Sequence, residues 1–122
     1  TSNNEKVAEI YLLRAKSVNL YKTFIELDGD ELPQLRSGQH TIITVPADPY
    51  NREHSIVIGR SGSEIPVRYV VNMLCEPGDQ YFILIHWNYV PALKYIPKQE
   101  AREIMQSSTF VTWEDWEKTK LP

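Results

Sequence analysis

Residues 67–89 read VRYVVNMLCEPGDQYFILIHWNY, and this stretch decides the class of fold. Apolar side chains occupy every second position on both sides of the Glu-Pro-Gly-Asp sequence at 76–79. A period of two is typical of β-strands, because successive side chains of a strand point to opposite faces of a sheet. Proline presets φ at the second position of a turn, and glycine supplies a positive φ at the third. We therefore predict a long antiparallel hairpin of residues 66–75 and 80–90.

The same period of two continues through the first half of the chain. Shorter alternating runs cover residues 8–13, 23–27, 40–45 and 54–58, with turn-forming residues between them. Strands spaced about ten residues apart without helical patterns between them are typical of sandwiches and barrels. We predict a single domain over residues 1–122, mainly β: an antiparallel β-sandwich, Ig-like or transthyretin-like, of about seven strands.

The pattern changes after Pro91. Residues 93–96 predict a last short strand. Residues 97–106 predict a C-terminal helix, because Pro97 suits the first turn of a helix and strong helix formers follow it. Residues 109–122 form an aromatic tail.

Length and composition exclude several classes of protein. The chain has 122 residues, of which 42% are hydrophobic and 24% charged, as in an ordinary folded domain. Its net charge of −3 argues against a nucleic-acid partner, since binding phosphates requires clustered Lys and Arg. No stretch approaches the ~20 apolar residues of a membrane span. The lone cysteine, Cys75, excludes an internal disulfide and a thiolate zinc site. We predict no cofactor and no metal.

Several of these segments follow one another in a familiar order. Residues 9–14 form a first strand, residues 24–29 a strand that ends in an Asp-Gly turn, and residues 41–46 a strand that runs into a proline loop. A Pro-Gly turn with an aromatic residue just after it comes next, and a short strand with a helix at 93–105 completes the order. Over about residues 8–106 this order resembles a small bacterial envelope domain of unknown function, which is usually found in short lipoproteins.

The resemblance implies a place in the cell. It indicates an exported bacterial protein of the cell envelope or periplasm, anchored by a lipid on a cysteine ahead of Thr1, and it carries over no catalytic residues. We therefore expect a non-enzymatic domain that binds another envelope protein or a cell-wall component and meets the membrane only through its lipid anchor. The sequence leaves the oligomeric state open.

Aromatic side chains are the candidate binding residues. Tyr and Trp often anchor interfaces, because they are large and lose little conformational entropy on binding. The alternative is that they fill the core and fold the tail over the sheet. The candidate partner-binding residues are Trp87, Tyr89, Tyr95, Phe110, Trp113 and Trp116.

Two other functions remain open. A metal-dependent or histidine-dependent hydrolase would need His40, His54 and His86 within a few ångströms of one another, with a carboxylate nearby. A secreted binder of a host protein or a toxin would form a tight one-to-one complex. We expect Cys75 to be a buried, protonated thiol rather than a nucleophile. The acidic turn at 28–31 has only a fragment of the spacing of a calcium loop, and we interpret it as a hairpin turn.

Overall fold

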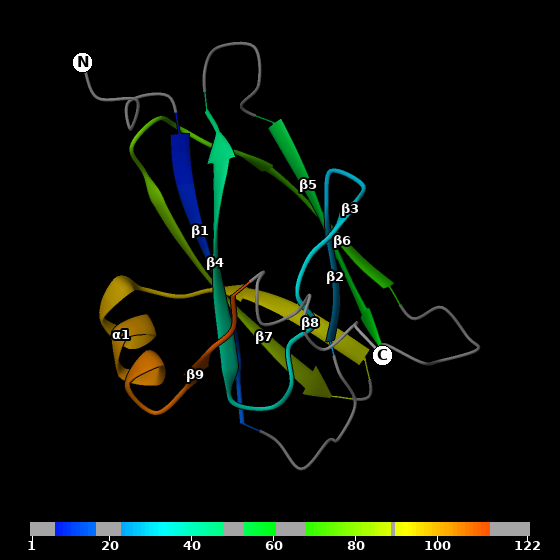
Figure 1. Ribbon diagram of the computed structural model, residues 1–122, viewed down its shortest axis with the longest axis vertical. Coiled ribbons are helices and arrows are strands. Elements are labelled where there is room, and N and C mark those ends of the chain that lie inside the picture. Colours follow the sequence, from blue (N-terminus) through cyan, green and yellow to red (C-terminus); the bar gives the residue numbers. More distant parts are fainter. Residues whose placement is uncertain (1–6, 17–22, 48–52, 61–67, 89, 113–122) are drawn as a thin grey trace.

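The fold is mainly β, with two sheets and one helix near the C-terminus (Figure 1). The structure is a computed structural model that describes residues 7–16, 23–47, 53–60, 68–88 and 90–112. Nine strands lie within these ranges, and seven of them have five or more residues. The prediction of a mainly β domain with a helix toward its C-terminus is confirmed.

The larger sheet has five strands in the order β8-β7-β1-β4-β9. β1 lies in its middle, antiparallel to β4 on one side and parallel to β7 on the other. β8 is antiparallel to β7, and β9 is parallel to β4. The bounds of these strands are Val7–Arg14 (β1), Gln39–Pro46 (β4), Gln80–Asn88 (β7), Val90–Tyr95 (β8) and Thr109–Phe110 (β9).

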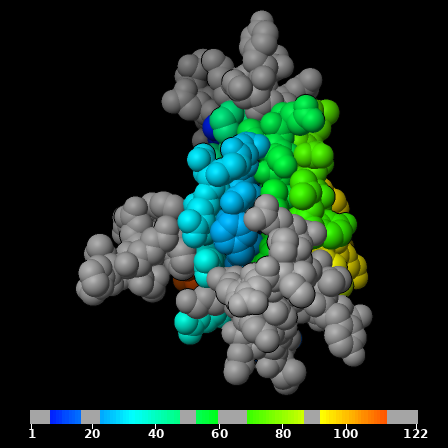
Figure 2. All heavy atoms as spheres, turned by 90° about the vertical axis from the view of Figure 1, so that its right-hand side faces the viewer, coloured from blue at the N-terminus to red at the C-terminus, as the bar shows by residue number. Residues whose placement is uncertain are grey.

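The smaller sheet has four strands in the order β3-β2-β5-β6, and all of its pairings are antiparallel. Figure 2 shows these strands side by side, from β2 and β3 in blue and cyan to β5 and β6 in green. Their bounds are Thr23–Leu27 (β2), Asp30–Glu31 (β3), Glu53–Arg60 (β5) and Arg68–Leu74 (β6).

One hydrophobic core lies between the two sheets. Ile10 and Leu12 of β1 pack in it together with Ile56 and Ile58 of β5, and all four side chains are 0% exposed. Their spacing of two residues places them on one face of each strand, so the alternation seen in the sequence is confirmed as the inward face. Removing this apolar surface from water is the main stabilising contribution to such a fold.

Helix α1 (Lys98–Gln106) covers the face of the five-stranded sheet that points away from the smaller sheet (Figure 1). Its Ala101 is 0% exposed and packs with Leu13 of β1 and Phe82 of β7. The expected helix at 97–106 is confirmed, with Pro97 as the residue that precedes it. Because α1 covers this second face, β1 is buried on both sides over part of its length.

The predicted hairpin of residues 66–75 and 80–90 is wrong. β6 pairs with β5, and β7 pairs with β1 and β8, so the turn at 76–79 carries the chain from one sheet to the other. The reason is visible in the turn itself: the Gly78 N–H donates to the Val7 carbonyl (2.8 Å), and the Glu9 N–H donates to the Asp79 carbonyl (3.0 Å). These hydrogen bonds hold the turn beside the start of β1. The expected all-antiparallel arrangement is also wrong, because the pairs β1–β7 and β4–β9 are parallel.

Ile10 tests the shared core. Ile10→Ala removes a fully buried side chain from the central strand, and we expect it to lower the free energy of unfolding by about 3 kcal/mol through lost burial and the void left behind. Thr44→Ala, at an exposed position of the neighbouring β4, is the matched control and should cost less than about 1 kcal/mol. Urea unfolding measures both, and equal losses would contradict the core assigned here.

Candidate functional site

The three histidines do not converge. His40 lies near the start of β4, whereas His54 contacts Pro46 at the end of β4, and the rise of a strand puts about 20 Å between these ends. His86 lies on β7, with β1 between it and β4. Within the described ranges, no group of three His, Cys, Asp or Glu residues could hold a metal ion. The histidine site that the hydrolase hypothesis needs is therefore not formed by these residues.

His54 is a buried structural clamp. Its Nδ1 lies 2.6 Å from Asp28 Oδ2, and its Nε2 lies 2.6 Å from the Pro46 carbonyl oxygen. A carbonyl and a carboxylate can only accept hydrogen bonds, so this geometry fits a ring that donates from both nitrogens and is therefore positively charged. Asp28 also accepts the backbone N–H of Ser55 (2.8 Å). The clamp ties the end of β4 and the start of β5 to the turn after β2.

The turn at Asp28-Gly29 is a hairpin turn, as expected from the sequence. It joins β2 to β3 with Leu27 opposite Asp30, and its two central residues have φ values of +51° and +88°. Such positive values are typical of two-residue hairpins, and Asp and Gly tolerate them. Burial would raise the pKa of Asp28, but the hydrogen bonds from His54 and Ser55 and the charge of His54 outweigh it and hold the pKa below its ordinary value.

His40 fastens the C-terminal segment. Its Nδ1 lies 2.8 Å from Ser108 Oγ, which donates to the Gly38 carbonyl at 2.9 Å. The Ser108 hydroxyl hydrogen is therefore directed at a carbonyl, whereas a nucleophilic serine would donate it to the imidazole. Burial lowers the pKa of His40 and favours the neutral ring. Beside it, the Val111 N–H donates to the His40 carbonyl at 2.8 Å. The hydrogen bonds of His40 to Ser108 and Val111 together hold β9 against β4.

Cys75 is buried, as expected from its place in the alternation. Burial raises the pKa of its thiol, and the charges of Asp28 and Glu76 raise it further. A thiol in this state stays protonated at neutral pH and is poorly suited to attack a substrate. The residue contributes packing to the core.

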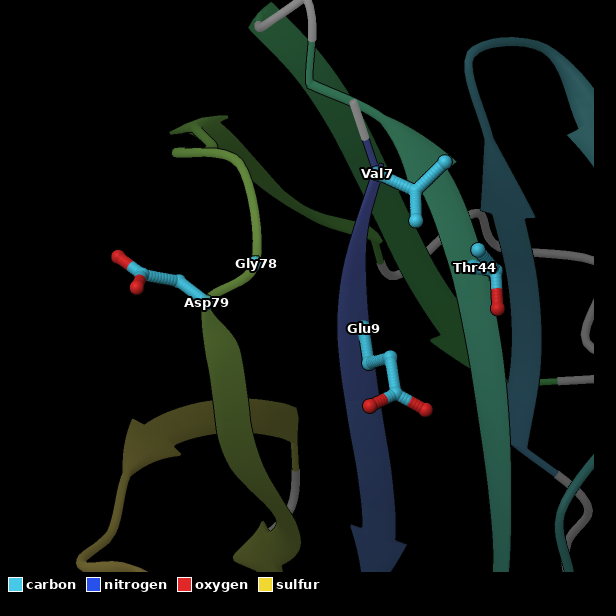
Figure 3. A pocket seen from close by; sticks show the side chains of 5 residues that line it. All are labelled: Val7, Glu9, Thr44, Gly78 and Asp79. Atoms are coloured by element: carbon cyan, nitrogen blue, oxygen red, sulfur yellow. The ribbon is translucent and has the colours of Figure 1, made fainter. Parts of the chain in front are cut away.

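A small hollow of about 120 Å³ opens on the outer face of the five-stranded sheet (Figure 3). The side chain of Asp79 points away from that of Glu9, which is directed toward β4. Glu9 Oε1 accepts a hydrogen bond from Gln80 Nε2 at 3.1 Å. The two carboxylates thus do not face a common point, and the hollow does not form a cation or acid–base site. Its lining residues are Val7, Glu9, Thr44, Gly78 and Asp79.

The two candidate aromatic residues whose side chains the structure describes lie far apart. Tyr95 is 59% exposed and Phe110 is 46% exposed, but they lie on β8 and β9, at opposite edges of the five-stranded sheet. Four strand spacings separate these edges, which is about 19 Å. Tyr89, Trp113 and Trp116 lie outside the described residues, as does the side chain of Trp87.

Tyr95 instead belongs to a group on the neighbouring edge of the smaller sheet. β8 contacts both β5 and β6, and Figure 2 shows β8 in yellow beside the green β6. Burial raises the pKa of Tyr95, and electrostatic interactions with Cys75, Tyr81 and Tyr69 raise it further. We call this group the β6–β8 edge: Tyr69 (42% exposed), Val70 (56%), Leu74 (60%) and Tyr95 (59%).

The β6–β8 edge contains three residues that the sequence analysis did not select: Tyr69, Val70 and Leu74. The available signal was that residues 69–74 are apolar on both faces, since Val71 and Met73 alternate with Val70 and Leu74. A strand that is apolar on both faces is expected in the middle of a covered sheet. Here it lies at the edge, where the outward-facing side chains are exposed.

The sheet edges differ in how well they are protected. β3 and β9 have two residues each, and β3 carries two carboxylates. β8 contains Pro91, which has no N–H to donate. β6 has seven residues and no charged side chain from position 69 to position 75. Short strands, charges and proline are the usual protections of a sheet edge, so in the described part of the chain β6 is the long edge that lacks them.

The chain was compared with protein-family models, with curated proteins and with solved structures, and none of the three comparisons found a match. Among the residues that the structure places, no helix has the length and apolar character needed to cross a membrane. The geometry of the β6–β8 edge is therefore the basis for assigning a function.

The clamp at His54 predicts a dependence of stability on pH. The pKa of Asp28 is lower in the folded chain than in the unfolded chain, where a carboxyl of this type titrates near ~3.9. Asp28 therefore contributes stability above that pH, and the contribution is lost as the pH falls through the folded pKa. Asp28→Asn keeps a side chain that tolerates the positive φ but removes the charge.

We expect Asp28→Asn to lower the free energy of unfolding by about 1 kcal/mol at pH 7, a modest loss because the Asp28 side chain is 44% exposed. The difference from the unmodified chain should vanish in strong acid. Asp30→Asn, an exposed carboxylate next to the turn, is the control. Urea unfolding from pH 7 down to pH 2 measures the effect. The prediction is contradicted if Asp28→Asn loses as much stability between these pH values as the unmodified chain does.

Proposed function

We propose that this chain is a non-enzymatic binding domain of the bacterial cell envelope, which holds another protein at the β6–β8 edge. The observation that supports this proposal is that β6 is a long sheet edge without the usual protection and carries three exposed, large apolar side chains. Val70 and Leu74 lie on one face of this strand and Tyr69 on the other, and the exposed Tyr95 lies on β8, which contacts β6. Isolated exposed apolar residues are common, but several of them along one open strand edge are typical of an interaction surface.

The mechanism is strand addition. An extended segment of the partner lies beside β6, and its backbone pairs with the N–H and C=O groups that β6 directs away from β5. Val70 and Leu74 then pack against alternate side chains of the partner, and the tyrosines supply aromatic anchors. An apolar strand edge of this kind favours a protein over a cell-wall glycan, because a glycan has no backbone that can continue the sheet.

The scaffold holds this edge in a fixed shape. β6 is paired with β5 over seven residue pairs, and Met73 of β6 is buried in the core between the sheets. A surface that is already ordered loses little conformational entropy on binding, which increases affinity. We propose that the two sheets form a sandwich of the Ig-like or transthyretin-like type, and the single core that they share supports this proposal.

Support for a non-enzymatic function comes from the groups that usually perform catalysis. His54 and His40 are engaged in bonds that hold strands and turns together, and Cys75 is a buried thiol with a raised pKa. Each of these groups has a structural role that explains its position. Among the residues that the structure describes, the β6–β8 edge has no comparable role in holding the fold together.

The envelope location is tested by mass spectrometry of the native protein recovered from its membrane fraction. We expect a diacylated cysteine ahead of Thr1, since the order of strands and turns over about residues 8–106 resembles a lipoprotein domain. Recovery of an unlipidated protein from the cytosol would contradict the location and leave the binding proposal to be judged on its own test.

Photo-crosslinking in the native host tests the binding edge. A benzoylphenylalanine at position 70 lies on the exposed face of β6, and one at position 102 lies on the exposed face of α1 and is the matched control. We expect irradiation to give protein adducts from position 70 and none from position 102. Equal adducts from both positions, or none from position 70, would overturn the proposal.

A further inference from the structure

We infer that the partner at the β6 edge is a second copy of this chain, joined by an antiparallel β6–β6 pairing in which Asn72 lies opposite Asn72. This inference rests on the proposed function, since it takes β6 as the contact edge. It adds the identity of the partner and the register of the contact.

The register follows from the chemistry of the outer face of β6. In a two-fold antiparallel pair centred on Asn72, Val70 of each copy lies opposite Leu74 of the other, so exposed apolar residues meet twice. A pair centred on Val71 would place Val70 opposite Asn72 instead, apolar against polar. The outer face of β6 reads apolar–polar–apolar in both directions, which is the symmetry that a two-fold interface requires.

The inner face of β6 is compatible with the same register. Val71 of one copy lies opposite Met73 of the other, and both residues belong to the side of β6 that packs on the core. The apolar layer between the sheets would therefore continue across the contact. Apart from the central Asn72 pair, pairing in this register is apolar on both faces of the joined sheet.

The paired segment carries no charge that would oppose the contact. Residues 69–75 are uncharged, and a pair centred on Asn72 matches these residues with one another, so no like charges face each other along the strand.

Asn72 in the centre gives the contact its specificity. Across the two-fold axis, each amide can both donate to and accept from the other. If the register slipped by two residues, Asn72 would face Val70 or Leu74 and its amide would lose that partner. A polar residue at the centre of an apolar contact thus disfavours the alternatives, as single asparagines do in coiled coils.

The contact closes on itself. Each copy uses its long unprotected edge, and the far edge of the smaller sheet ends in the two-residue, acidic β3. The joined sheet would have four strands from each copy, a size that open sheets commonly reach. Assembly should therefore stop at two chains rather than continue into a fibre.

The first experiment measures mass against concentration. Sedimentation of the purified chain from 1 µM to 1 mM should show a shift from 14.2 kDa to about twice that mass. Val70→Lys places a charge opposite Leu74 on both sides of the contact and should raise the dimer Kd by at least about 30-fold. Thr44→Lys adds the same charge at an exposed site of the other sheet and should leave the Kd unchanged.

The second experiment tests the register by disulfide formation. Residues directly opposite each other in an antiparallel pair have Cα atoms about 5 Å apart, within reach of a disulfide. Asn72→Cys should therefore crosslink with itself on oxidation, and a mixture of Val70→Cys and Leu74→Cys should crosslink in the mixture only. The unmodified chain, whose lone cysteine is buried, is the control.

Several outcomes would overturn the inference: a monomer at every concentration, growth beyond two chains, equal weakening by Thr44→Lys, or self-crosslinking of Val70→Cys as strong as that of Asn72→Cys. The photo-crosslinking test separates this failure from failure of the proposed function. If the purified protein is monomeric and position 70 gives adducts whose mass is not twice that of the chain, the dimer inference is overturned and the proposed function stands. Absence of any adduct would overturn both.

Discussion

The parallel pairing of β1 with β7 determines what the rest of the molecule presents to its surroundings. β7 follows β6 in the chain after a tight turn, and the two strands would ordinarily form a hairpin. Because β7 lies beside β1 in the other sheet, β6 has β5 as its only hydrogen-bonded strand neighbour in the described structure. The exposed apolar edge is thus a direct consequence of how the middle of the larger sheet is completed.

Much of the fold could be read from the sequence, because alternation reports burial directly. The strand positions, the helix after Pro97 and the Asp28-Gly29 turn follow from local patterns. Strand partners could not be predicted in the same way. The turn at 76–79 has the composition of a hairpin turn, and only its hydrogen bonds to Val7 and Glu9, about 70 residues away in sequence, show that it changes sheets.

The candidate site was predictable only in part, and the histidines explain why. In the sequence His40 and His54 are equivalent as possible ligands, yet each bonds to residues from distant segments: Ser108 for one, Asp28 and Pro46 for the other. Tyr95 was selected from the sequence because it is aromatic, and its side chain is 59% exposed. Its neighbour Tyr69 was not, because the approach of β8 to β6 is a property of the packed sheets rather than of either strand.

The same parallel pairing has a consequence for how the chain reaches its folded state. Gln80 lies opposite Glu9 and bonds to it across 71 positions, so β1 cannot gain its second neighbour until two-thirds of the chain has been made. Contacts between residues so far apart in sequence slow folding, because a long loop must close before these contacts can form. The larger sheet is therefore completed only after most of the chain has been synthesised.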